Sequence, residues 1–469
     1  MADSRRTVRR TAATLFTSLL LVGAAAGGQL ATAQSGVAPD AEILTLTGTS
    51  TDVDLDAGTL AVLEENGVSV APVAPATVSS SGGTTTASFP ITEGYVAVYP
   101  RSELPFIRGT FSHSGGLTFS AGGTSVTATN FIVNPGSSTL TATVGGNAVQ
   151  LLDLDGSNVQ ITPEGSTTRI EGTIAELSST GAQALNQTFG VTIFEQGIPL
   201  GTVRIAAQGT AGPGGVPSAE IVSLGGESTN VDLDAGTLGV LEENGVSVAP
   251  VGPATVSSSG GTTTASFPIS QGYVSVYPTS QAPFVRGTFS HVGGVTFSAG
   301  GTSLTATDFV VNPGNSTLTA TVGGNAVELL DLDGSNVTVT PDGSTTRIEG
   351  TVALLSADAA QALNQTFGVT IFEQGIPLGT VRIAAVEGPP PGIVGSQSPA
   401  DSPAAQTPPS TTATQPSSGS AQVPSGGVAT GGGGTAGDGS LAAGTVAAVA
   451  LVLAGGGLWL ARSRSRQLD

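Results

Sequence analysis

Short runs of alternating apolar and polar residues fill most of the chain between its two ends. Segments rich in Val, Ile, Thr and Phe are separated by Gly, Asn and Pro at intervals of about ten residues. A period of two places one side of each segment against a core, which is typical of β-strands. Strands are predicted at 88–91, 95–99, 109–113, 125–129 and 131–133.

Two short helices are predicted between these strands. The first begins after an N-cap at Asp56, carries Leu60 and Leu63, and ends at Gly67. The second covers 182–188 and ends at Gly190. The predicted fold class is therefore mainly β, a β-sandwich or open barrel with short helical caps.

The whole pattern occurs twice. An offset of 178 residues brings 41–43 onto 219–221 and continues without a gap to 205–207 on 383–385. A period this long is a complete domain rather than a solenoid unit, so each copy should bury its own core. We expect domains at 40–207 and 218–385, joined at 208–217 by a flexible linker containing Gly and Pro.

The N-terminal end has the features of a secretory signal peptide over residues 1–33. Arginines at positions 5, 6, 9 and 10 precede an apolar run, and 31–33 reads as a small-x-small cleavage pattern. This predicts an exported protein. A mature chain would then begin shortly before the first domain.

The C-terminal end is typical of a surface anchor. Residues 386–440 are rich in Pro, Ser, Thr and Gly and should form an extended, disordered stalk. Residues 441–461 carry no charge, and as a helix they would be about 30 Å long, enough to cross a bilayer. The basic tail 462–469 predicts a single transmembrane span with this tail inside.

Charge and cysteine content exclude several function classes. The chain has 34 acidic residues, 14 basic residues that are all arginine, and a formal net charge of −20. Such a surface repels phosphate backbones, so no nucleic-acid partner is expected, whereas cations are favoured. Without cysteine there is no disulfide framework, thiolate metal site or cysteine nucleophile.

One ordered series of segments resembles the HtaA-type domain of Gram-positive surface proteins. The matching segments are 89–94, 109–117, 130–133, 140–144, 151–155, 182–185 and 194–197, and copy two repeats them. The resemblance covers about the last two-thirds of each domain and implies haem binding or haem uptake. His113 and His291 fall on the family's histidine. The family's haem-ligating tyrosine has no counterpart here, and neither domain contains a tryptophan.

Tyrosines elsewhere in each domain are further candidate haem ligands. Tyr95 and Tyr99 are four residues apart on a predicted strand and so share one face; Tyr273 and Tyr277 repeat them in copy two. A haem site would need such partners beside the one histidine of each domain. The alternative is that His113 is a turn residue hydrogen-bonded to the backbone.

A calcium site is a second candidate. Asp153 and Asp155, repeated as Asp331 and Asp333, stand in a D-L-D-G-S-N segment that resembles the start of a calcium loop. Calcium prefers six to eight oxygen ligands, and the third ligand position of the EF-hand pattern is missing here. The alternative is a solvated turn.

Catalytic motifs are absent from the sequence. No serine stands in a nucleophile-elbow context, no phosphate-binding glycine loop follows a strand, and no His-x-x-x-His pair occurs. The two copies differ at candidate carboxylates such as Glu93, which is Gln271 in copy two. We therefore expect no enzyme activity.

Arginines at three positions are common to both copies: 108, 169 and 204, matched by 286, 347 and 382. In so acidic a chain they should form ion pairs with Asp or Glu, or else hold an anionic group such as a haem propionate or a wall carboxylate.

The leading hypothesis is a non-enzymatic binding or structural protein at the bacterial cell surface. The alternatives are a haem-binding protein and a calcium-stabilised adhesin. The expected partners are the membrane and a cell-wall or extracellular ligand. The C-terminal layout is similar to sortase-anchored proteins, but 427–431 contains only the Thr-Gly of the sorting motif. Wall attachment and membrane retention both stay open.

Overall fold

Paired β-strands make up most of the structure, as the alternating pattern predicts. The computed structural model describes residues 36–387 except 47–49, 165–166, 226–227 and 343–344, and these residues lie in one compact unit. The predicted signal peptide, the stalk from residue 388 onward, the span at 441–461 and the basic tail lie outside the described residues. Among the described residues, no helix combines the length and hydrophobicity needed to cross a membrane.

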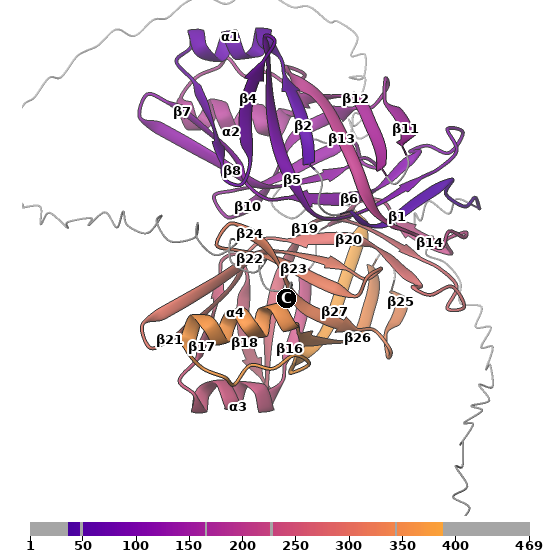
Figure 1. Ribbon diagram of the computed structural model, residues 1–469, viewed down its shortest axis with the longest axis vertical. Coiled ribbons are helices and arrows are strands. Elements are labelled where there is room, and N and C mark those ends of the chain that lie inside the picture. Colours follow the sequence, from indigo (N-terminus) through magenta and orange to yellow (C-terminus); the bar gives the residue numbers. More distant parts are fainter. Residues whose placement is uncertain (1–35, 47–49, 165–166, 226–227, 343–344, 388–469) are drawn as a thin grey trace, which may run out of the picture. The chain divides into compact units, whose positions relative to one another are not determined.

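The elements follow the same order in both copies, except that β1 of the first copy corresponds to two short strands, β14 and β15, in the second (Figure 1). The first copy contains β1 (Ala41–Leu46), β2 (Ser50–Leu55), α1 (Ala57–Glu65), β3 (Ser69–Val73), β4 (Thr77–Ser81), β5 (Thr84–Val98), β6 (Ile107–His113), β7 (Gly116–Ala121), β8 (Thr124–Asn134), β9 (Thr139–Val144), β10 (Asn147–Asp155), β11 (Gln160–Glu164), β12 (Thr167–Leu177), α2 (Ser179–Phe189) and β13 (Pro199–Ala211).

The second copy contains β14 (Ala219–Ile221), β15 (Leu224–Gly225), β16 (Ser228–Leu233), α3 (Ala235–Glu243), β17 (Ser247–Val251), β18 (Thr255–Ser259), β19 (Thr262–Val276), β20 (Val285–His291), β21 (Gly294–Ala299), β22 (Thr302–Asn312), β23 (Thr317–Val322), β24 (Asn325–Asp333), β25 (Thr338–Asp342), β26 (Thr345–Leu355), α4 (Ala357–Phe367) and β27 (Pro377–Glu387).

Eight antiparallel strands close into a barrel in each copy. In the first, the order is β2-β5-β6-β8-β9-β10-β12-β13, and β13 pairs with both β12 and β2 to complete the ring. In the second, the order β16-β19-β20-β22-β23-β24-β26-β27 closes in the same way. The mainly β prediction is confirmed. The expected barrel is closed rather than open, so its ring strands have no free edges.

Several strands are longer than the sequence predicts. Segments 88–91 and 95–99 belong largely to the single strand β5, and 125–129 and 131–133 belong to β8. The pairing register shifts between Ile91 and Glu93 in β5 and between Thr129 and Ile132 in β8. The residues skipped in the pairing, Thr92 in β5 and Asn130 and Phe131 in β8, therefore form β-bulges, which bend a strand without ending it.

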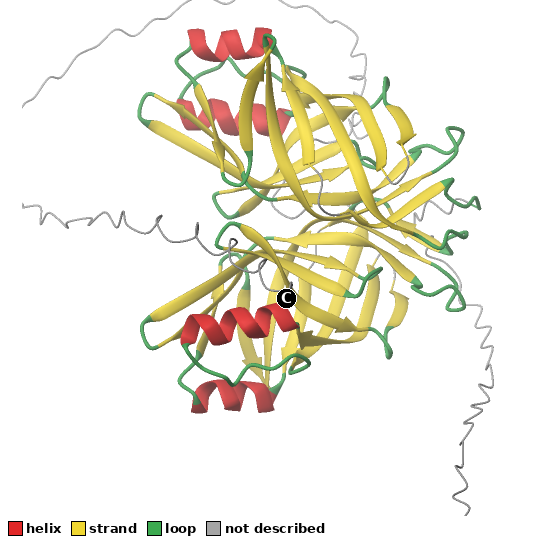
Figure 2. Ribbon diagram, in the orientation of Figure 1, coloured by secondary structure: helices red, strands yellow, loops and turns green. Residues whose placement is uncertain are grey.

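Both predicted helices are confirmed. Asp56 caps α1 by accepting a hydrogen bond from the Thr59 amide. Helix α2 begins earlier than predicted because Ser178 is its N-cap, and it ends at Gly190 in the left-handed conformation. The helices pack together through Leu63 of α1 and apolar residues of α2, and in each copy they lie on the same side of the barrel (Figure 2).

The boundary between the copies differs in detail from the predicted linker. Strand β13 continues to Ala211, four residues into the range 208–217, because its end pairs with β1 from Ile43 to Leu46. The pairing satisfies backbone groups that a free linker would leave to water. Residues 212–217 then connect the copies without regular structure.

Candidate functional site

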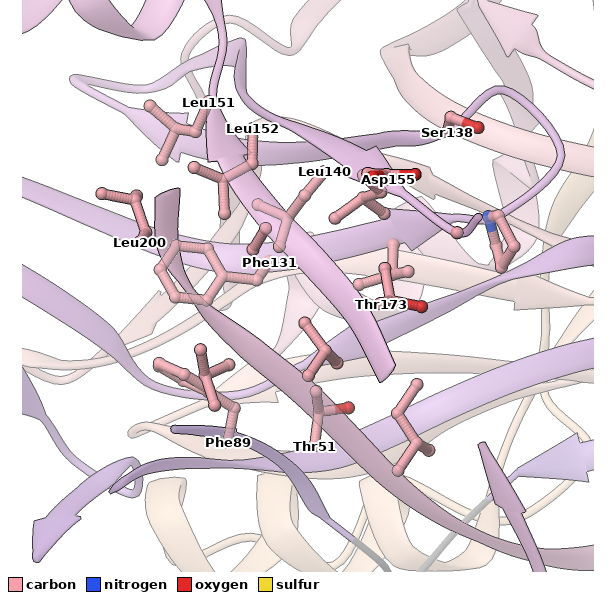
Figure 3. A pocket seen from close by; sticks show the side chains of 18 of the residues that line it. Thr51, Phe89, Phe131, Ser138, Leu140, Leu151, Leu152, Asp155, Thr173 and Leu200 are labelled. Atoms are coloured by element: carbon pink, nitrogen blue, oxygen red, sulfur yellow. The ribbon is translucent and has the colours of Figure 1, made fainter. Parts of the chain in front are cut away.

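Each barrel encloses an apolar cavity. In the first copy the cavity has a volume of about 480 Å³, and all eight barrel strands and α1 contribute to its wall. Phe89, Phe131, Leu140 and Leu200 are among the side chains around it (Figure 3). An eight-stranded barrel is wide enough to be filled by side chains or to hold one small ligand. The volume is in the range of small-molecule sites.

Strand β6 illustrates how the sequence builds this wall. Ile107, Phe111 and His113 line the cavity. Arg108 and Thr110 point to the opposite face, because successive side chains of a strand alternate in direction. Every residue of β6 is buried. The strand thus has a core on one face and the second copy against the other.

The second barrel repeats the cavity at equivalent positions, with a volume of about 570 Å³. Val285 stands where the first copy has Ile107, and Val295 where it has Leu117. Each of these changes removes one methylene from the wall, which agrees with the larger volume. Most other lining residues are identical.

Charged side chains in the cavity walls are carboxylates only. Among the described residues that line either cavity there is no lysine or arginine. In the first copy, Asp56 accepts a hydrogen bond from the Thr59 amide at 2.7 Å. Asp155 accepts one from the Ser157 amide at 2.8 Å, and this bond lowers the pKa of Asp155.

His113 lines the cavity but has both ring nitrogens engaged. Its Nδ1 donates to the Phe131 carbonyl oxygen at 2.8 Å, since a carbonyl oxygen only accepts. Nε2 therefore accepts from the Thr51 hydroxyl at 2.6 Å. Burial lowers the pKa of His113 to about 4, so the ring is neutral at neutral pH.

His291 has the same environment in the second barrel. Its Nε2 lies 2.6 Å from the Thr229 hydroxyl and its Nδ1 lies 3.1 Å from the Phe309 carbonyl oxygen. Burial lowers the pKa of His291 to about 4 as well. The repeated geometry agrees with the sequence-based interpretation of a histidine hydrogen-bonded to the backbone.

The candidate tyrosines lie on the outer face of the barrels, where the two copies meet. Tyr95 stacks on Tyr273 with ring centroids 5.4 Å apart and an interplanar angle of 13°. The Tyr95 hydroxyl donates to Glu42 at 2.7 Å, and burial raises the pKa of Tyr95. Tyr99 donates across the interface to Glu220 at 2.8 Å. Neither Tyr95 nor Tyr99 lines the first cavity.

Two reciprocal ion pairs join the copies. Arg108 of the first copy pairs with Glu220 of the second, and Arg286 of the second pairs with Glu42 of the first at 2.9 Å. All four side chains are almost completely buried. Arg286 also lies over the ring of Tyr277, 3.6 Å from its centroid. The ion pairs predicted for these arginines are confirmed, with partners in the other copy.

Hydroxyl groups at the centre of the interface pair with their own counterparts. Thr110 and Thr288 have their side-chain oxygens 2.7 Å apart, and those of Ser112 and Ser290 are 2.8 Å apart. Each pair is separated by 178 residues, the repeat offset. The interface is therefore pseudo-symmetric, like the isologous interface of a two-fold dimer.

The residues proposed for haem are not brought together. His113 lies at the cavity, whereas Tyr95 and Tyr99 face the other copy on the far side of the barrel wall. The lone pair of His113 Nε2 is directed to Thr51. None of the described residues that line the cavity is a cation that could receive propionates. In this arrangement the lining residues do not fit haem.

The residues proposed for calcium are engaged in separate local contacts. Asp153 accepts hydrogen bonds from the side-chain amides of Gln150 and Gln196, and Asp155 accepts from the Ser157 amide. Asp331 and Asp333 accept hydrogen bonds in the same way from Gln374 and from the Ser335 amide. Across the described part of the chain, no three His, Cys, Asp or Glu side chains are grouped as metal ligands.

Comparison with known proteins gives remote similarity only, and only to solved structures. No protein-family model matches the sequence, and no curated protein matches it. Among solved structures, the C-terminal domain of HtaA from Corynebacterium glutamicum matches 36% of this chain and 99% of that chain, with 14% identity and a TM-score of 0.25. This likeness is too weak to support a functional argument, which must come from the chain's own cavities.

The cavity itself was missed at the level of sequence. Its walls come from strands that are far apart in the sequence, such as β2 and β13. Each strand contributes apolar side chains that resemble ordinary core residues. The one available signal was the repetition of His113 with apolar neighbours at alternating positions. That signal predicts that one face of the strand turns inward, but it does not predict that the space beside this face is unfilled.

Proposed function

We propose that this protein is a non-enzymatic binding protein of the bacterial cell surface, and that each barrel holds one apolar small molecule. The proposal combines the exported, anchored layout expected from the sequence with the two cavities. Binding of this kind needs burial of apolar area and a few polar contacts, not reactive groups. The cavity-lining histidine and carboxylates engaged in local hydrogen bonds support a role without catalysis.

The observation that carries this proposal is the size of the apolar cavity and its repetition. Cores normally pack at the density of organic crystals. At roughly 24 cal/mol per Å³, filling 480 Å³ with side chains would gain on the order of 10 kcal/mol. That gain is comparable with the whole stability of a typical domain. Both copies nonetheless retain the space, which favours a ligand site over imperfect packing.

Duplication has a physical use in this setting. With two sites in one chain, a ligand that leaves one barrel is close to the other. This raises the effective concentration of binding sites for a ligand that is presented repeatedly or at a surface. The expected stalk would extend the domains from the membrane, and the buried ion pairs between the copies would keep both barrels in a fixed relation.

The test uses the fragment 36–387, which contains both barrels and their interface within one compact unit. Omitting the predicted span avoids detergent, which would compete for an apolar cavity. We expect saturable fluorescence enhancement of the uncharged dye N-phenyl-naphthylamine. Replacing Thr173 and Thr351, which line the two cavities, by Phe should abolish this enhancement.

Matched controls lie on the outer face of the barrels. Thr202 and Thr380 are exposed strand residues outside the cavities, so Thr202→Phe and Thr380→Phe should leave dye binding unchanged. Absence of saturable binding, or equal binding by the cavity-filled variant, would refute the proposal. Adding haem to the same fragment tests the alternative, because ligation through His113 and His291 predicts a Soret shift that the double variant His113→Ala/His291→Ala abolishes.

A further inference from the structure

The charge pattern of the cavities restricts the ligand further. We infer that the ligand of each barrel is an elongated apolar molecule with an uncharged or cationic head group, and that anionic amphiphiles are excluded. This inference rests on the proposed function, because it concerns the same cavities. It is drawn from the shape of the lining and from the charges at its ends.

The lining extends along the strands. On β10 it runs from Leu151 to Asp155, and on β2 from Thr51 to Leu55. At about 3.3 Å per residue, each stretch covers roughly 13 Å. Figure 3 shows Leu151 and Asp155 well separated around the space. A chain-like molecule fits such a cavity better than a compact polar one.

Carboxylates occur in two separate parts of the lining. Asp56 stands at the start of α1, and Asp155 stands at the end of β10. Asp234 and Asp333 occupy the equivalent places in the second barrel. The remaining titratable group of the lining, His113 or His291, is buried and neutral at neutral pH.

An anionic head group would find no opposite charge among the described residues of these walls. Deep in the cavity the anionic head group would lose its hydration without compensation. Near either carboxylate the anionic head group would be repelled, which should weaken its affinity about fivefold. An uncharged head group avoids both costs.

One arginine near the first cavity makes the second barrel the sharper test. Arg101 lies over the ring of Phe106 and donates to the Val159 carbonyl oxygen at 3.1 Å; both Phe106 and Val159 line the cavity. Thr279 stands at the equivalent position of the second copy. Exclusion of anions should therefore be measured with the first barrel blocked by Thr173→Phe.

The experiment displaces N-phenyl-naphthylamine from the Thr173→Phe fragment 36–387 at neutral pH. The competitors are dodecanol, dodecyltrimethylammonium and dodecanoate, which share one chain length and differ in head-group charge; all are kept below their micelle-forming concentrations. We expect dodecanol and the cation to displace the dye at concentrations at least about tenfold lower than dodecanoate. Equal or better displacement by dodecanoate would overturn the inference.

A single carboxylate provides the second readout. Asp333→Asn should improve displacement by dodecanoate about fivefold relative to displacement by dodecanol. If the ratio of the displacing concentrations of dodecanoate and dodecanol stayed unchanged, the role given to this carboxylate would be contradicted. Failure of the dye to bind would refute the proposed function, whereas dye binding with the reverse order of competitors would refute only the charge selectivity.

Discussion

The inner and outer faces of strand β6 are both buried, yet they are built from opposite chemistry. The inner face carries Phe111 and His113 beside an apolar cavity. The outer face carries Arg108 and Thr110, whose polar groups are paired with the second copy. A buried polar surface is stable only where each group finds a partner, and the duplicated domain supplies these partners.

This difference separates two tasks within one strand. The reciprocal contacts of the outer face specify one arrangement of the two copies, since buried charges tolerate few alternatives. The apolar contacts of the inner face depend less on exact geometry than ion pairs do, so the inner face can surround an unfilled volume. Specificity between copies and capacity for a ligand are therefore encoded at alternate residues.

Breaking the outer face should have the largest effect on stability. Arg108→Met leaves Glu220 buried without its cation and should lower the free energy of unfolding by about 3–5 kcal/mol. Urea denaturation of fragment 36–387 measures this change. The control is Arg204→Met, which breaks the more exposed pair with Asp54 and should cost less than about 1 kcal/mol.

A compensating variant makes the same test more specific. Combining Arg108→Met with Glu220→Gln removes both charges and should recover part of the lost stability, because no unpaired charge remains buried. A similar loss of unfolding free energy for Arg108→Met and Arg204→Met would show that the stability of the interface between the copies does not depend on its buried ion pairs.

Acidification should reveal how much the buried histidine of the inner face contributes to the stability of the fold. The folded pKa of His113 is about 4, below the ordinary value of 6.5, so the unfolded chain binds the proton more readily. The stability from this histidine is complete above pH 6.5 and is lost as pH falls towards 4, by about 3 kcal/mol. His291 should contribute similarly.

The measurement compares unfolding free energies of the parent fragment and the His113→Gln/His291→Gln variant across this pH range. Carboxylates titrate in both proteins, so the difference between their pH profiles isolates the histidines. The variant should have the flatter profile. Parallel profiles would mean that neither ring is held neutral by burial.

The smallest effect concerns a difference between the copies on the outer face. Burial raises the pKa of Glu93, and the Asn312 amide donates to it at 2.9 Å. Because the folded pKa is raised, the associated stability is present at low pH and is lost as pH rises. Glu93→Gln should therefore stabilise the fragment at neutral pH by on the order of 1 kcal/mol.

The second copy supplies the reverse substitution. Gln271 occupies the equivalent position and accepts a hydrogen bond from Asn134, so Gln271→Glu should destabilise the fragment at neutral pH and less so in acid. Thermal melts at both pH values measure the two variants. Effects of the same sign for Glu93→Gln and Gln271→Glu would contradict this account.

Local features of the fold were predictable because their causes are local. The caps at Asp56 and Gly190 follow from hydrogen bonding and glycine geometry within a few residues. Strand positions followed from the period of two. The bulge beside Glu93 is not predictable in this way, because its unpaired residue, Thr92, has no local preference that distinguishes a bulge from a strand end.

The candidate site was predictable only in part. The sequence points to His113, and a hydrogen bond from its ring to the backbone is one of the two roles that the sequence allows. The sequence pattern places Tyr95 and Tyr99 on one face of a strand, but alternation alone does not say which face of the strand turns inward. For a strand buried on both sides, polar residues do not mark solvent exposure, so the tyrosines could not be distinguished from cavity-lining residues by pattern.

The sequence by itself determined the duplication, the mainly β class, the helix caps and the alternating faces, because these depend on neighbouring residues or on self-comparison. Only the tertiary structure decided that β13 closes the ring with β2, that a cavity remains inside, and that Arg108 meets Glu220. These features join residues far apart in the chain. Their geometry depends on how many strands close the barrel and on which surface the second copy covers.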